Sequence, residues 1–253
     1  MVIVNDSVDS EYSKFVNGIT FKHILPSTSL PIGYGFLIKW LGRFNLLPGR
    51  LDLAVATLPY EDSVTKKNLR NLCRIPKMST FAIGAMINKG VSLMNPNECF
   101  LNIGVWNGFT FLSGLVNNED KTCIGVDNFS QFGGPRDAFL KRFNKYKSPS
   151  HHFFDMDYEE YFKKEHKGKI GFYIYDGGHA YKDQLQGLEV AEPYFSDNCI
   201  ILVDDINWKE PYEATLEFAK KSKNKYAIIL EKRTKCNCHP TLWNGIMLLQ
   251  KIP

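Results

Sequence analysis

The sequence has no long hydrophobic run and no concentrated block of basic residues. No apolar stretch approaches the roughly 20 residues that a membrane-spanning helix needs. The 31 basic residues are scattered among 27 acids, giving a net charge of +4, whereas a nucleic-acid binder usually shows a concentrated basic face. The sequence therefore predicts no stable membrane insertion and no nucleic acid as a partner.

Signs of secretion and of a zinc site are also scarce. The first residues, MVIVNDSVDS, lack the basic region and the apolar stretch of a signal peptide, so we expect a cytoplasmic protein without disulfides. The cluster Cys236-Asn-Cys238-His239 has the residue types of a metal site but no second cysteine pair. We interpret it as a loop with incidental thiols.

Short apolar runs alternate with helical patterns from Glu98 onward. Such alternation predicts a mostly parallel sheet with helices on both faces, and the last two runs, with no helix between them, indicate an antiparallel hairpin at the sheet edge. With 253 residues and 44% hydrophobic content, the chain is long enough for one large α/β domain or a core domain with an appendage. The expected strands are 99–103, 122–126, a run leading to Asp155, 170–175, 199–203, 226–230 and 245–249.

The N-terminal third has a different pattern, which predicts helices at 36–47, near 62–74 and at about 79–90. In the first of these, Phe36, Trp40, Phe44 and Leu47 share one face. We interpret this face as packing against the sheet domain or against a second subunit, as in a homodimer. A substrate lid is an alternative, and a membrane-surface helix is less favoured because its basic face is thin.

Acidic residues follow four successive predicted strands. In an open α/β sheet, ligands bind outside the carboxyl ends of the strands. A single acid there commonly caps the next helix, but acids at four successive strand ends predict a ligand site. These acids are Asp127, Asp155 or Asp157, Asp176, and the pair Asp204-Asp205.

The turn after the first of these strands, Gly104-Val-Trp-Asn-Gly108, lets the backbone approach a ligand closely. It lacks the full Gly-x-Gly-x-x-Gly pattern of dinucleotide-binding folds. Asp127, about 20 residues further on at the end of the next strand, suits the hydroxyls of a ribose. Together these features favour S-adenosylmethionine over NAD as the ligand.

Five segments carry a resemblance to a known family: NIGVWNG (102–108), GVD (125–127), DMDYEEYF (155–162), YDGGHAYKD (175–183) and LVDDINW (202–208). From about residue 79 to 251 the sequence resembles the class I S-adenosylmethionine-dependent methyltransferases, above all the metal-dependent O-methyltransferases of the catechol and antibiotic-sugar types. The resemblance implies a Rossmann-like, doubly wound, seven-stranded sheet over residues 76–253. Residues 1–75 would then be a helical extension.

The resemblance also implies roles for individual residues. Gly104 and Gly108 would line the methionine part of the cofactor, Asp127 would bind its ribose, and Asp157, with Asp155 as second choice, would face its adenine. Asp176, Asp204 and Asp205 would bind a divalent cation such as Mg²⁺. Asn102 stands where the family usually has an acid, so the affinity for the cofactor could be lower.

His179 comes three residues after Asp176, where related catechol enzymes place a lysine base. A histidine suits proton transfer near neutral pH; the alternative is a residue that caps or packs at a helix start. We therefore expect methyl transfer to a hydroxyl of a small molecule, namely a sugar, a polyketide or a phenol. The alternatives are a metal-independent N- or carboxyl-methyltransferase, a non-catalytic cofactor-binding protein and, with least support, a nicotinamide dehydrogenase.

Overall fold

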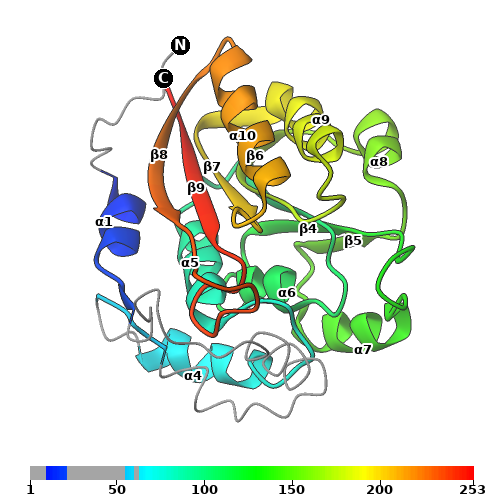
Figure 1. The fold of residues 1–253 in the computed structure, drawn as a ribbon. Helices are drawn as coiled ribbons and strands as arrows, with labels where there is room; N and C mark the ends of the chain where they lie inside the picture. Colours follow the sequence, from blue (N-terminus) through cyan, green and yellow to red (C-terminus); the bar gives the residue numbers. More distant parts are fainter. Residues whose placement is uncertain (1–9, 22–54, 60–62) are drawn as a thin grey trace.

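A seven-stranded sheet forms the centre of the molecule (Figure 1). The computed structural model describes residues 10–21, 55–59 and 63–253. The strand order is β5-β4-β3-β6-β7-β9-β8, and all neighbours are parallel except the pairs β7–β9 and β9–β8. The predicted mostly parallel sheet with a closing antiparallel hairpin is therefore confirmed. Its strands are β3 (Glu98–Ile103), β4 (Thr122–Val126), β5 (His151–Phe154), β6 (Lys169–Tyr175), β7 (Phe195–Asp204), β8 (Lys225–Lys232) and β9 (Ile246–Ile252).

The central strands are continuous apolar runs because both of their faces are buried. Successive side chains point to opposite faces, so Phe100 and Phe172 belong to one hydrophobic layer, while Leu101 and Tyr173 belong to the other. A run with apolar residues at every position is therefore what two covered faces require.

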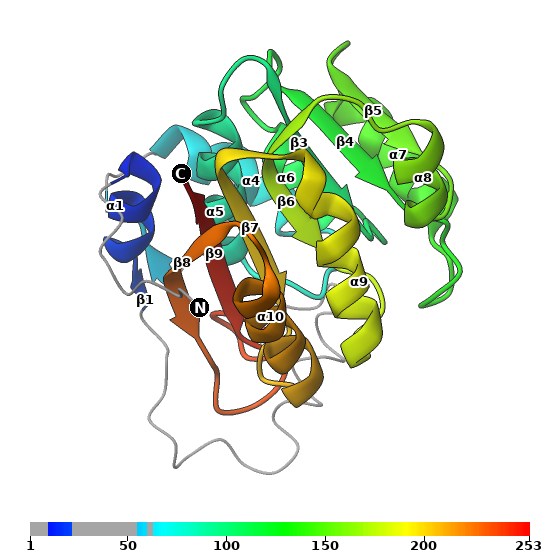
Figure 2. The ribbon, with the colours of Figure 1, turned by 90° about the horizontal axis from the view of Figure 1, so that it is seen from above.

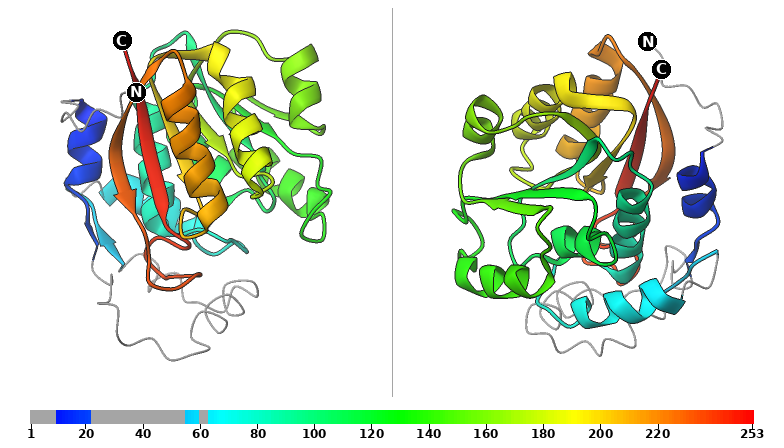
Figure 3. Two further views of the ribbon diagram at one scale, coloured as in Figure 1. Left: turned by 45° about the horizontal axis from the view of Figure 1, so that its top comes forward. Right: turned by 180° about the vertical axis from the view of Figure 1, so that it is seen from behind.

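Helices cover both faces of the sheet (Figures 2 and 3). On one face α5 (Phe81–Ser92), α6 (Phe109–Leu115) and α7 (Arg136–Tyr146) contribute to the first layer. On the other face lie α8 (Tyr158–Lys164), α9 (Tyr181–Ala191) and α10 (Lys209–Lys221), with a 3-10 turn, Glu192–Tyr194, leading into β7. Because every parallel strand ends at the same edge, the loops into α6, α8, α9 and α10 meet there.

The described part of the N-terminal third packs onto this domain. Helix α1 (Glu11–Asn17) lies beside β8 in Figure 1, where the Tyr12 hydroxyl donates to the carbonyl of Met86 at 3.2 Å and its ring meets Phe172 edge-on. A two-stranded ladder joins β1 (Thr20–Phe21) to β2 (Ala56–Thr57). The helices expected near 62–74 and 79–90 are α4 (Ser63–Leu72) and α5.

The helix expected at 36–47 lies outside the described residues, so its interpretation as a subunit contact or a lid stays a prediction. The division between residues 75 and 76 also stays a prediction. Within the described ranges, no helix is long and apolar enough to cross a membrane.

Candidate functional site

The turn after β3 brings the ends of three strands together. Gly104 has a φ of +78°, and its N–H donates to the carbonyl of Val126, at the end of β4, at 2.8 Å. A Cβ on Gly104 would lie 1.9 Å from the carbonyl oxygen of Asp176, which follows β6. Only glycine combines this φ with such a close approach. The glycine of the predicted turn is thus needed to join the ends of β4, β3 and β6.

Asp127 fastens this turn from the end of β4. Its Oδ2 accepts hydrogen bonds from the backbone N–H groups of Val105 and Trp106, both at 2.8 Å. Its Oδ1 accepts one from Phe129 at 2.7 Å. A carboxylate has about four acceptor positions, so one stays open to a ligand hydroxyl. Asp127 therefore shapes the loops on both sides of it as well as facing the site.

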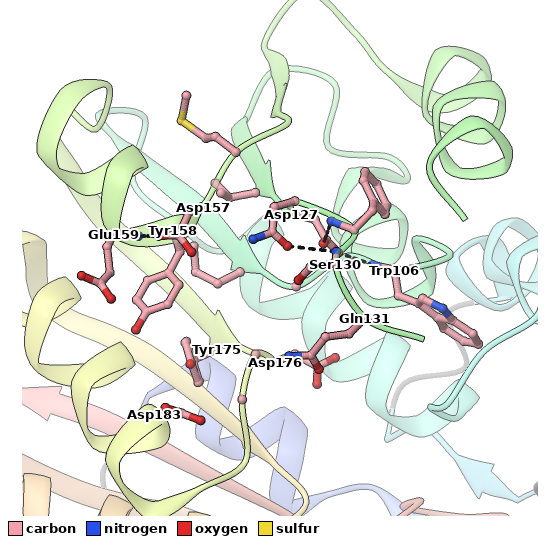
Figure 4. Close-up of a pocket in the computed structure, with 18 of the residues that line it drawn as sticks. Trp106, Asp127, Ser130, Gln131, Asp157, Tyr158, Glu159, Tyr175, Asp176 and Asp183 are labelled. Atoms are coloured by element: carbon pink, nitrogen blue, oxygen red, sulfur yellow. Dashed lines mark hydrogen bonds between the residues drawn. The ribbon is translucent and has the colours of Figure 1, made fainter. Parts of the chain in front are cut away.

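A cleft of about 320 Å³ opens at this edge of the sheet. Four of the predicted site residues line it, namely Gly104, Asp127, Asp157 and Asp176. In Figure 4, Asp157 and the start of α8 lie on one side, Trp106 on the other, and Asp127 between them. The structure thus places the glycine turn and acids from three successive strand ends around one cavity.

The two candidates for the adenine contact are in different surroundings. Asp157 lines the cleft and caps α8, because its Oδ1 accepts from the N–H of Glu159 at 2.8 Å. Asp155 forms an ion pair with Arg136 and is not among the residues that line the cleft. The first choice, Asp157, is therefore the one in a position to contact a ligand.

Two other predicted residues support the turn from behind and do not line the cleft. Asn102 is fully buried, and its Nδ2 donates to the carbonyl of Gly104 at 2.9 Å, while its Oδ1 has no hydrogen-bond partner. Gly108 begins α6 with a φ of +97°, and a Cβ there would meet Phe139 at 2.9 Å. Both residues hold the backbone in the shape that the cleft requires.

Part of the cleft lining was not predicted from the sequence. The loop after Asp127 contributes Phe129 and Phe132, which both have positive φ, and the Trp106 ring nitrogen donates to the carbonyl of Phe132 at 3.1 Å. The pair Gly133-Gly134 was the available signal of a special turn here. Tyr158, Tyr175, Asp183 and Gln186 also line the cleft.

His179 lies between two acids. Its Nε2 is 3.0 Å from Oδ2 of Asp205 and 3.8 Å from Oδ1 of Asp176, and its ring meets Trp208 edge-on at 5.1 Å. The N-cap of α9 is Ala180, which makes no side-chain capping bond. The capping alternative is therefore wrong for His179, because its ring is directed to the acids rather than to the helix start.

These groups alter one another's protonation. Desolvation raises the pKa of Asp176 to about 6; the charge of His179 opposes this rise, and Asp205 adds to it. Desolvation acts to lower the pKa of His179, but the hydrogen bond to Asp205 and the charge of Asp176 outweigh it, so that the pKa is raised. Burial, reinforced by Asp205 and Asp176, raises the pKa of Asp204 well above its ordinary value. The cluster therefore favours a protonated imidazole among its carboxyl groups.

Asp204 and Asp205 are both buried and differ in their contacts. Asp204 accepts from the backbone N–H of Asp205 at 2.8 Å. Asp205 has a φ of +58°, and its Oδ1 accepts from Nδ2 of Asn244 at 2.7 Å. With Oδ2 facing His179, both oxygens of Asp205 have protein partners.

The predicted metal ligands do not fit a divalent cation in this arrangement. In the described part of the chain, no group of three or more His, Cys, Asp or Glu side chains is placed to hold a metal ion. In this arrangement His179 and Asn244 each engage one oxygen of Asp205, so fewer of its acceptor positions are left for a cation. The cation at Asp176, Asp204 and Asp205 therefore stays a prediction.

Comparisons with known proteins agree with the fold. Residues 101–206 match the family model described as a methyltransferase domain, a segment that holds the glycine turn, Asp205 and all of the cleft lining except Met78. No curated protein matches the sequence.

Solved structures share the fold at low sequence identity. An O-methyltransferase from Bacillus cereus in complex with SAH has a TM-score of 0.55 at 10% identity, covering 76% of this chain and 92% of that one. A Klebsiella pneumoniae protein assigned as an O-methyltransferase has a TM-score of 0.53 at 11% identity, covering 77% and 92%. Cofactor-bound Rv0187 from MTB has a TM-score of 0.53 at 10% identity, covering 74% of this chain and 88% of that one.

Residues 101–206 thus match a methyltransferase domain, and the chain has the fold of solved O-methyltransferases.

Proposed function

We propose that this enzyme transfers the methyl group of S-adenosylmethionine to a hydroxyl of a small molecule. The observation that carries this proposal is the position of His179. Its imidazole is held by Asp205 and lies beside Asp176, which lines the cofactor cleft. His179 itself is not among the residues that line the cleft, but a histidine fixed beside a lining residue is suited to removing a proton from the acceptor.

Different residues of the cleft would bind different parts of the cofactor. Gly104 would approach its methionine part, Asp127 would accept a hydrogen bond from its ribose, and Asp157 would face its adenine. Each of the three lines the cleft, and the open acceptor position on Asp127 supports the ribose contact. Asn102 and Gly108 would act indirectly, by holding the backbone of the turn.

The acceptor oxygen attacks the methyl carbon in line with the carbon–sulfur bond. A carbon–oxygen bond forms, the carbon–sulfur bond breaks, and S-adenosylhomocysteine leaves with the electron pair on its sulfur. The acceptor proton goes to His179. His179 must be neutral to take this proton, which requires a pH above its raised pKa. In the neutral imidazole one nitrogen carries a proton, and the contact with Asp205 assigns this proton to Nε2. Nδ1 is then the nitrogen that takes the acceptor proton.

A divalent cation at Asp176, Asp204 and Asp205 is a second proposal for the same reaction. Such a cation would lower the pKa of a bound hydroxyl. It is supported by the gathering of three carboxyl groups, whose mutual repulsion a cation relieves. It requires His179 to leave Asp205.

The acceptor would be a sugar, a polyketide or a phenol, because the resemblance points to enzymes that act on such hydroxyls. A homodimer, a cytoplasmic location and the absence of a nucleic-acid partner are expectations from the sequence that we retain as proposals.

Methyl transfer from labelled S-adenosylmethionine to panels of hydroxyl, amine and carboxyl acceptors tests the proposal directly. We expect turnover on a hydroxyl panel and a large loss in His179→Ala. Calorimetric titration with S-adenosylmethionine and S-adenosylhomocysteine provides the control for cofactor binding. Turnover confined to amines or carboxylates would contradict the proposal, as would cofactor binding without transfer to any acceptor.

A further inference from the structure

The loop between β8 and β9 (residues 233–245) lies against the strand end that carries Asp204 and Asp205. Two asparagine side chains hold the two segments together. Asn207 exchanges two hydrogen bonds with Thr234, donating to Oγ1 at 2.8 Å and accepting from the backbone N–H at 2.9 Å. Asn244, at the far end of the loop, donates to Oδ1 of Asp205 at 2.7 Å. Of these two side chains, Asn244 is the one that touches a predicted site residue.

The orientation of the Asn244 amide is determined by its surroundings. The side chain is buried, and its Oδ1 accepts from the backbone N–H of Cys238 at 2.6 Å. A backbone N–H can only donate, so the atom facing Cys238 must be the oxygen. The NH₂ group must then face Asp205. The backbone carbonyl of Asn244 also accepts from the N–H of Asn207 at 2.8 Å, which fixes the residue on its other side.

Asp205 connects the Asn244 amide to the imidazole of His179. One carboxylate oxygen receives the Asn244 amide and the other faces Nε2 of His179 at 3.0 Å. A carboxylate held at one oxygen cannot rotate freely, so the direction of the other oxygen is fixed. Asp205 has a left-handed backbone, with a φ of +58°, which is uncommon for a residue other than glycine. Its carboxylate therefore leaves the backbone in an uncommon direction, and the hydrogen bond from Asn244 is more important for holding it there.

The geometry points to Asn244 as a positioning residue that fixes the carboxylate of Asp205 and thereby the imidazole of His179. This role rests on the proposed function of His179 as the base. It also gives a use to the Cys236-Asn-Cys238-His239 segment, whose chemistry is otherwise unassigned. What that segment contributes is the backbone N–H of Cys238, which directs the Asn244 amide, rather than a thiol ligand.

Two matched substitutions test this role. Asn244→Asp keeps the size of the side chain and the acceptor for Cys238, but it replaces the donor to Asp205 by a carboxylate oxygen. Asn207→Asp makes the same chemical change in a contact between the same two segments, without touching Asp205. We expect kcat to fall about 10- to 100-fold in Asn244→Asp, the range for a lost hydrogen bond to a charged group, with an unchanged Kd for S-adenosylmethionine. Asn207→Asp should keep a kcat close to that of the wild type.

Nuclear magnetic resonance of the ¹⁵N-labelled histidines provides a readout that is independent of catalysis. The His179 signals, assigned by their loss in His179→Ala, should shift in Asn244→Asp and stay in place in Asn207→Asp. Unchanged His179 signals in folded Asn244→Asp would overturn the positioning role, as would an equal fall of kcat in both variants. If Asn244→Asp does not fold, Asn244→Ala, which adds no charge, is measured in the same way.

The same data separate a failure of this role from a failure of the proposed function. Wild-type turnover in His179→Ala would remove the base assignment, while the His179 signals would still report whether Asn244 holds it through Asp205.

Discussion

The carbonyl oxygen of Asp176 approaches Gly104 so closely that no side chain fits between them: a Cβ on Gly104 would lie 1.9 Å from it. This contact joins the turn after β3 to the residue that leads toward His179. The cleft proposed for the cofactor and the proposed base therefore depend on the same backbone contact.

Gly104→Ala should destabilise the protein strongly. A left-handed φ costs an L-residue roughly 1–2 kcal/mol, and the clash with Asp176 adds to this, so we expect a loss above about 2 kcal/mol in the free energy of unfolding. Gly133→Ala is a matched control, because Gly133 has a similar φ of +80° but nothing within 4 Å of its Cβ position. Urea unfolding of both variants checks this prediction. An equal loss in the two would show that the contact with Asp176 is unimportant.

Asp127→Asn should weaken the binding of S-adenosylmethionine about 10- to 100-fold, the range for a lost hydrogen bond to a charged group. The variant should also be less stable, because backbone N–H groups that donate to the carboxylate in the wild type would face the NH₂ group of the new amide. Asp155→Asn is the control, since Asp155 pairs with Arg136 and does not line the cleft. Calorimetric titration measures both affinities. An unchanged affinity in folded Asp127→Asn would remove the ribose assignment.

His179→Ala should lower kcat about 10²- to 10⁴-fold, the range for a positioned base, and leave the cofactor affinity nearly intact. The cofactor contacts proposed above involve other residues, which is why binding should survive. Single-turnover kinetics and calorimetry on the same preparation check the prediction. A stable variant with wild-type kcat would end the catalytic assignment of His179.

Treatment with a chelator should leave methyl transfer at its full rate. The reason is that His179, held by Asp205, provides a base for the acceptor proton without a metal. Initial rates before and after EDTA, and again after addition of Mg²⁺, test this. A loss that Mg²⁺ restores, and that Asp204→Asn makes permanent, would show instead that a cation displaces His179.

His166 should make the protein less stable in acid. Burial lowers the pKa of its imidazole to about 4, whereas an unfolded histidine titrates near 6.5. Below pH 6.5 the unfolded chain therefore binds a proton that the folded chain does not. Stability is fully present above that pH and is lost as the pH falls toward 4, by up to about 3 kcal/mol.

Urea unfolding between pH 7 and pH 4 measures this loss. His166→Phe should reduce it, because phenylalanine takes up no proton. Its ring suits a site where His166 packs against Phe162 and Tyr194. The exposed His152 offers a control in His152→Gln. The same pH dependence in His166→Phe and in the wild type would assign the acid sensitivity to other groups.

Much of the fold was predictable because burial on both faces leaves a strong sequence pattern. An apolar run that ends in an acid marked β4, β6 and β7, and the glycine turn marked the end of β3. The same pattern located Asp127, Asp157 and Asp176 at the cleft, since the carboxyl ends of parallel strands lie at one edge.

The partners of His179 were less predictable. Asp205 and Asn244 are 39 residues apart, and an asparagine in a loop carries no pattern that names its contact. The metal prediction treated Asp205 as a free ligand for the same reason. Asn102 is similar: its place in a motif indicated a role near the cofactor, but only the structure shows that its amide is directed to the backbone of Gly104.

The position of β9 has a consequence for how the protein is made. β9 pairs with β7 on one side and with β8 on the other, so the neighbour that β8 has among the described strands forms only once residues 246–252 have been synthesised. During translation, the parallel strands β3 to β7 can pair with one another, whereas β8 can pair with β9 only after β9 has been made. Asn244, just ahead of β9, arrives at Asp205 at the same late stage. The strand ends that line the cleft are therefore synthesised before Asn244, the residue proposed to hold the base in place.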